Sequence, residues 1–115
     1  MYKVTIKGCV GSCDSSLFKK MAEKGDIQAT RIKDAVDSVV SISGYAICHV
    51  ETDDKNFDIN YYATDDGFIS SGSEVFLNSV KDYYGETKYV KIIKVSTKKG
   101  STFKVTPILE DKNEE

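Results

Sequence analysis

The chain has 115 residues, which suits one domain with one hydrophobic core. Hydrophobic residues make up 40% of it and charged residues 30%, a composition too apolar for a disordered chain. No apolar run approaches the roughly 18 residues that a transmembrane helix needs, so we expect no membrane span. The first residues lack an apolar signal segment, and we therefore expect a cytoplasmic protein whose three cysteines are free thiols.

The charge is distributed unevenly along the chain, although the net charge is only −2. Between Thr87 and Leu109 there is no acidic residue and there are six lysines: Lys88, Lys91, Lys94, Lys98, Lys99 and Lys104. Residues 110–115, in contrast, form a mostly acidic tail. A local basic segment of this kind can attract phosphates whatever the net charge of the chain.

A strand and a helix are predicted for the N-terminal part of the chain. Tyr2, Val4 and Ile6 alternate with polar residues, which is typical of a half-buried strand over residues 1–10. Ser15 or Ser16 can cap a helix that continues to about Lys24. Residues 1–29 are thus expected to form an N-terminal extension.

Five strands and a second helix are predicted for the rest of the chain. Gly44 indicates a bulge, Asp66-Gly67 a tight turn, and Ser73 the start of the helix. Alternation fails near Ile92–Ile93, which predicts another bulge. In chain order we predict three strands, the helix and two strands: Val39–Glu51, Asn56–Ala63, Gly67–Ser71, Glu74–Tyr84, Lys88–Thr97 and Thr102–Leu109.

This order of elements is that of a small five-stranded Greek-key barrel of the OB type. We therefore predict a mainly β fold with two helices. A single domain would span residues 1–109, with the barrel formed by residues 30–109 and the helix between strands three and four. Residues 110–115 would follow it as the acidic tail.

A binding face is predicted from the alternation along these strands. If Val40, Ala46 and Cys48 point into the core, Tyr45 points outward, and the same reasoning turns Tyr62 outward. In OB folds the ligand usually contacts strands two and three and the loops beside them, which is where Tyr62 and Phe68 lie. Aromatic rings stack on unpaired bases while lysines contact phosphates. We thus predict that Tyr45, Tyr62 and Phe68 stack on bases and that the six lysines bind phosphates.

Residues from about Arg31 to Leu109 resemble the small OB-fold single-stranded DNA-binding proteins of bacterial phages and mobile elements. The matching features are Ile32-Lys33-Asp34 before a long strand, Asp66-Gly67, the serines Ser71 and Ser73, Phe76 in the helix, and the lysine-rich closing hairpin. The resemblance implies sequence-independent binding of single-stranded DNA in replication or recombination. Replication or recombination proteins, and further copies of the chain, are candidate partners, and the sequence does not give the oligomeric state.

Two other functions stay open at this point. Tyrosines are common on strands and lysines protect edge strands, so a protein-interaction module on an exposed barrel edge is the alternative. An enzyme would have to use His49, the only histidine, and no nucleophile motif accompanies it. Zinc would need Cys9, Cys13 and the pair Cys48-His49, whose neighbouring side chains should point to opposite faces. We therefore predict no enzyme, no metal and no cofactor.

Overall fold

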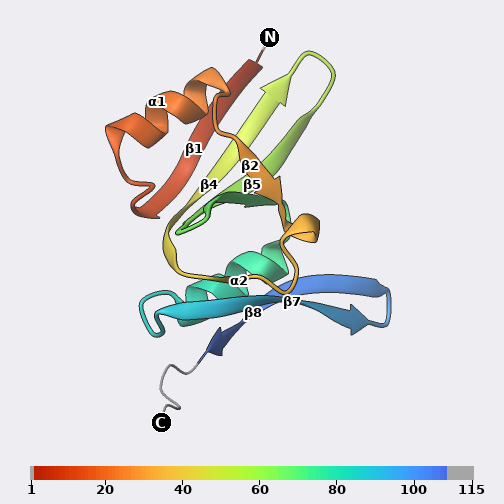
Figure 1. The fold of residues 1–115 in the computed structure, drawn as a ribbon. Coiled ribbons are helices and arrows are strands. Elements are labelled where there is room, and N and C mark those ends of the chain that lie inside the picture. Colours follow the sequence, from red (N-terminus) through yellow and green to blue (C-terminus); the bar gives the residue numbers. More distant parts are fainter. Residues whose placement is uncertain (1, 109–115) are drawn as a thin grey trace.

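The computed structural model describes residues 2–108, which form two β-sheets and two α-helices (Figure 1). The elements in chain order are β1 (Tyr2–Gly11), α1 (Ser16–Lys24), β2 (Ala29–Arg31), the 3-10 turn η1 (Ile32–Asp34), β3 (Val39–Val40), β4 (Ile42–Thr52), β5 (Asn56–Thr64), β6 (Gly67–Ser71), α2 (Glu74–Tyr83), β7 (Tyr89–Thr97) and β8 (Gly100–Ile108). The prediction of a mainly β chain with two helices is confirmed.

The larger sheet has the strand order β1-β4-β5-β6-β2. The predicted N-terminal strand is confirmed as β1, which pairs antiparallel with β4 along its whole length. The predicted N-terminal helix is confirmed as α1. Ser15 caps it by accepting a hydrogen bond from the Phe18 amide at 3.1 Å, and Gly25 ends it in the left-handed conformation.

The smaller sheet has the strand order β3-β7-β8. The single strand predicted over Val39–Glu51 is therefore two strands, of which β3 joins the smaller sheet and β4 the larger one. The register between β4 and β5 shifts between Ile42 and Gly44, which confirms the predicted bulge. A Cβ atom on Gly44 would lie 2.5 Å from the carbonyl oxygen of Val10, so the close approach of β1 requires glycine here.

The strand pairings do not close the two sheets into a barrel. Closure would need a pairing between β6 and β8, but the short strand β2 occupies that edge of β6 in a parallel pairing. Ala29 lies beside Phe68, and Arg31 beside Ser70. The sheets therefore remain separate and leave a seam between β6 and β8.

The hairpin of β7 and β8 is regular. Its strands pair without a register shift from Tyr89 and Ile108 to Thr97 and Gly100. The bulge predicted near Ile92–Ile93 is therefore wrong. The apolar residues that seemed to break the alternation simply lie on both faces, with Ile92 in the core and Ile93 half-buried on the outer face.

Two hydrophobic cores lie on opposite faces of the larger sheet. The larger core, between the two sheets and α2, includes Tyr45, Tyr62, Phe76 and Ile92. The smaller core, beneath α1, consists of Cys13, Phe18, Ala22, Ala46 and Cys48. Because β4 contributes to both cores, it is buried on both of its faces. Neither described helix is long and apolar enough to cross a membrane.

Candidate nucleic-acid interface

The β7–β8 hairpin, with the residue before it, carries all six lysines that were predicted to bind phosphates, and it projects from one end of the molecule (Figure 1). Lys88 precedes β7, Lys98 and Lys99 form the turn, and Lys104 lies in β8. Five of the six are exposed, and Lys91 is half-buried. The hairpin is thus basic from its base to its turn.

The register of the hairpin places these lysines on both of its faces. Residues directly opposite each other on paired strands share a face. Lys104 lies opposite Ile93 on the outer face of the hairpin. Lys94 lies opposite Phe103 on the other face, which contributes Ile92 and Val105 to the larger core. The cations therefore surround the hairpin, and a phosphate chain could follow it along more than one path.

The hairpin lysines are free of ion pairs within the described residues. None of them has a carboxylate within 4.0 Å, whereas Lys7 reaches Asp58 at 3.6 Å and Lys19 reaches Asp14 at 3.2 Å. The ammonium group of Lys88 lies 5.6 Å from the centre of the Tyr89 ring. The acidic turn that joins β4 to β5 lies at the opposite end of the molecule (Figure 1). Phosphates at the hairpin would thus meet unpaired cations.

The predicted outward positions of Tyr45 and Tyr62 are wrong. Tyr62 is 0% exposed and packs edge-on against Phe76, with ring centres 5.0 Å apart. Tyr45 is 9% exposed and packs edge-on against Tyr84. The prediction assumes that one face of the strands is in solvent, but both faces of this sheet are covered. Neither ring is accessible for stacking on a base.

The third predicted stacking residue, Phe68, lies beneath α1. Its ring centre is 5.7 Å from that of Phe18, in the smaller core. Phe18 also contacts Tyr61 in an edge-on arrangement. Helix α1 therefore covers the face of β4, β5 and β6 that carries Phe68, which is opposite to the face that carries Tyr45 and Tyr62. Phe68 itself is half-buried, and the three rings that were predicted to stack on bases do not share one face.

A cavity of about 310 Å³ lies in the seam between the two sheets. It is lined by Arg31 at the end of β2, by Ile32 and Lys33 of η1, and by Ile59, Ser70, Ser71, Gly72 and Phe103. Its wall is mostly apolar, and its two charged residues are both cations. Sequence reasoning missed this site. Alternation along β8 assigns Phe103 to the core, and the basic pair Arg31 and Lys33 is the only signal that points to a site here.

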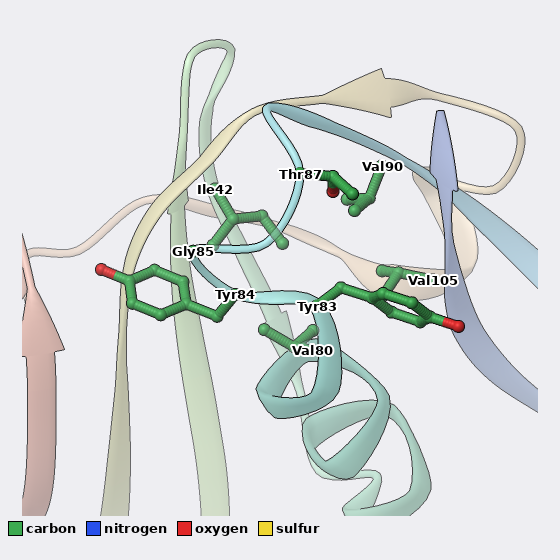
Figure 2. A pocket seen from close by; sticks show the side chains of 8 residues that line it. All are labelled: Ile42, Val80, Tyr83, Tyr84, Gly85, Thr87, Val90 and Val105. Carbon is green, nitrogen blue, oxygen red and sulfur yellow. The ribbon is translucent and has the colours of Figure 1, made fainter. Parts of the chain in front are cut away.

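A second cavity, at the end of α2, is too small for a ligand. Figure 2 shows Tyr83 and Tyr84 pointing in opposite directions beside it, with Val80 and Val105 in its wall. The volume in which the centre of a water molecule can lie is about 10 Å³, so the cavity has room for about one water. The Tyr84 hydroxyl donates a hydrogen bond to the Ser43 carbonyl at 3.0 Å, so this tyrosine holds α2 against β4.

His49 lies in a polar cluster at the exposed end of the larger sheet. Its Nδ1 is 2.8 Å from a carboxylate oxygen of Asp58, and its Nε2 is 3.9 Å from Glu51. The hydrogen bond from His49 and the charge of Lys7 lower the pKa of Asp58. Among the described residues, no serine, threonine or cysteine side chain hydrogen-bonds to His49. The cluster is therefore a set of polar contacts around His49 in which no serine, threonine or cysteine of the described residues takes part.

The three cysteines gather at the smaller core. Cys13 and Cys48 are buried, and burial raises the pKa of each thiol to about 11. Cys9 is half-buried and donates a hydrogen bond to Asp14 at 3.5 Å. No group of three or more histidine, cysteine, aspartate or glutamate side chains in residues 2–108 is arranged to hold a metal ion.

The hairpin and the seam cavity are thus two features of the described residues that could contact an extended ligand. Comparison of this chain with models of known families, with curated proteins and with solved structures finds no match.

Proposed function

We propose that this protein binds single-stranded nucleic acid, DNA above all, largely without regard to sequence and without catalysis. One observation carries the proposal: the β7–β8 hairpin and the residue before it hold six lysines, no acidic residue and no ion pair among the described residues. Binding of polyanions to lysines releases counterions, and this supplies affinity that does not depend on sequence.

The arrangement of the strands supports the same proposal. The pairings β3–β7, β4–β5, β5–β6 and β7–β8 are those expected of an OB-type Greek-key barrel that has stayed open at one seam. The basic hairpin joins the last two strands of that arrangement. A role with single strands exposed during replication or recombination of a phage or mobile element follows from the resemblance described above.

The proposal can be tested by titrating a fluorescent oligo-dT with the protein at several salt concentrations. We expect binding that is micromolar or tighter at low salt and that weakens steeply as salt rises. The variant Lys94→Gln/Lys98→Gln/Lys99→Gln should bind at least about tenfold more weakly at low salt. Removing one lysine–phosphate pair lowers the slope of log affinity against log salt by about 0.7, so this slope should fall by about 2.

The matched control is Lys3→Gln/Lys20→Gln/Lys24→Gln, which removes the same number of charges from exposed lysines of β1 and α1. It should keep nearly the whole salt slope of the wild type. Equal weakening in both triple variants would show that net charge, and not the hairpin, drives binding. Absence of oligonucleotide binding at low salt would contradict the proposal itself.

A second candidate function, protein interaction, is favoured by the edge of β1. This strand ends the larger sheet, and a groove lined by Val4, Ile6, Lys19 and Glu23, among others, runs between it and α1. An extended peptide can add to an uncovered strand edge of this kind. The same titration separates the two functions, because a peptide-binding module need not bind oligo-dT.

A further inference from the structure

The seam between β6 and β8 contains a mostly apolar opening next to the basic hairpin. Its cavity, about 310 Å³, is at the lower end of the range of small-ligand sites. Four parts of the chain line it: the β2–η1 junction, Ile59 of β5, the end of β6 and the middle of β8. It exists because β2, and not β8, pairs with β6.

The charged residues that line the cavity are all positive. Arg31 and Lys33 line it and are exposed, and no carboxylate of the described residues lines it. Lys94 lies directly across the hairpin from Phe103 and so shares its face. Within residues 2–108 none of these three cations has an acidic partner within 4.0 Å. The cavity therefore favours an apolar group that is attached to an anion.

An unpaired nucleotide has that combination. A base has two apolar faces, which would contact Phe103 and Ile32, and a polar edge, which the Ser70 side chain could meet. Its phosphates would lie by Arg31, Lys33 and Lys94. A base within a duplex is already stacked on both faces and cannot enter such a site.

We propose that the seam cavity is a base-binding pocket that takes one unpaired base of the strand held by the β7–β8 hairpin, with Phe103 as the stacking residue. This inference rests on the proposed function and adds the selection of single strands over duplexes to it. Phe103 also packs against the larger core, so replacing it could disturb folding. A variant that fills the pocket is a cleaner test.

Gly72 lines the pocket, so Gly72→Val adds a branched side chain to its wall. Gly72 has no left-handed φ, and a Cβ atom there would meet only the Asp58 carbonyl oxygen, at 3.4 Å. The matched control is Gly8→Val in β1, where φ is also not left-handed and a Cβ atom would meet nothing within 4 Å. Each variant and the wild type are titrated at low salt with oligo-dT and with an abasic deoxyribose-phosphate strand of equal length.

We expect the wild type and Gly8→Val to bind oligo-dT about tenfold more tightly than the abasic strand, because the abasic strand has no base to stack in the pocket. Gly72→Val should bind both strands with the affinity that the wild type has for the abasic strand. Equal binding of both strands by the wild type, or an unchanged preference in Gly72→Val, would overturn the base pocket and leave the proposed function standing. Binding of neither strand by the wild type would overturn both.

Discussion

The hydroxyl of Tyr62 is the one buried side-chain polar atom within residues 2–108 that has no hydrogen-bond partner. Burial raises the pKa of this hydroxyl well above its usual range. The nearby Asn60 side chain lowers that pKa in part, but its position does not give a hydrogen bond of ordinary geometry. A buried donor without a partner loses its bonds to water on folding and gains nothing in return.

Tyr62→Phe should therefore raise the free energy of unfolding, by about 1 kcal/mol, because it removes the unpaired hydroxyl and keeps the ring. Urea denaturation measures the change. Tyr84→Phe is the matched control with the opposite expected sign, since the Tyr84 hydroxyl bonds to the Ser43 carbonyl. A loss of stability in Tyr62→Phe as large as that in Tyr84→Phe would mean that the Tyr62 hydroxyl has a partner in solution.

One hydroxyl group links α2 to β8 by hydrogen bonds, beside the apolar contacts of the larger core. Ser79 of α2 accepts a hydrogen bond from the Val105 amide at 3.1 Å and donates one to the Phe76 carbonyl at 2.8 Å. The Val105 amide lies on the edge of β8 that faces away from β7, where a strand partner is absent from the described sheet. The helix thus protects a strand edge that would otherwise be open.

Ser79→Ala should lower the free energy of unfolding by about 1–3 kcal/mol, because the Val105 amide would no longer have a hydrogen-bond partner. Ser96→Ala, on the exposed part of β7, is the control and should change it by less than about 0.5 kcal/mol. Native-state hydrogen exchange adds a local measurement, in which the Val105 amide should exchange faster in Ser79→Ala. Unchanged protection of this amide would show that Ser79 does not hold the edge.

Most elements could be predicted from local signals, because these signals act within a few residues. Ser15 and Ser73 cap helices, Asp66-Gly67 forms a turn, and Gly44 marks a bulge, all as expected. The strand β2 could not be predicted, since three residues pair in parallel with β6 only after the chain has folded. The same pairing leaves the sheets unclosed, and the closed barrel therefore does not follow from the order of elements.

The candidate site was predicted in part. The hairpin lysines lie where the sequence placed them, since charge and turn residues identify an exposed hairpin. The faces of β4 and β5 could not be assigned, because alternation tells which residues share a face but not which face is in solvent. Helix α1 covers one face and the larger core the other, so Tyr45 and Tyr62 had no outward position to take.

At the scale of the molecule, the larger sheet is a central layer between two cores of unequal size. The smaller core beneath α1 contains two buried thiols, Cys13 and Cys48, among only five buried residues. Ionisation of either thiol would place a charge in an apolar region. The stability of the whole fold is therefore linked to pH through this core.

We expect the free energy of unfolding to fall as the pH rises from 9 to 11. Burial raises the pKa of Cys13 and Cys48 to about 11, from the 9.0 of an accessible thiol. In this range the unfolded chain releases protons that the folded chain retains, and the equilibrium shifts towards the unfolded state. Tyr61, whose pKa burial also raises, acts in the same direction. Urea denaturation at several pH values measures the slope, and Cys48→Ala should make it less steep, whatever the stability of this variant at pH 7. An equal slope in the variant and the wild type would show that the thiols are accessible to solvent and that α1 does not seal the smaller core.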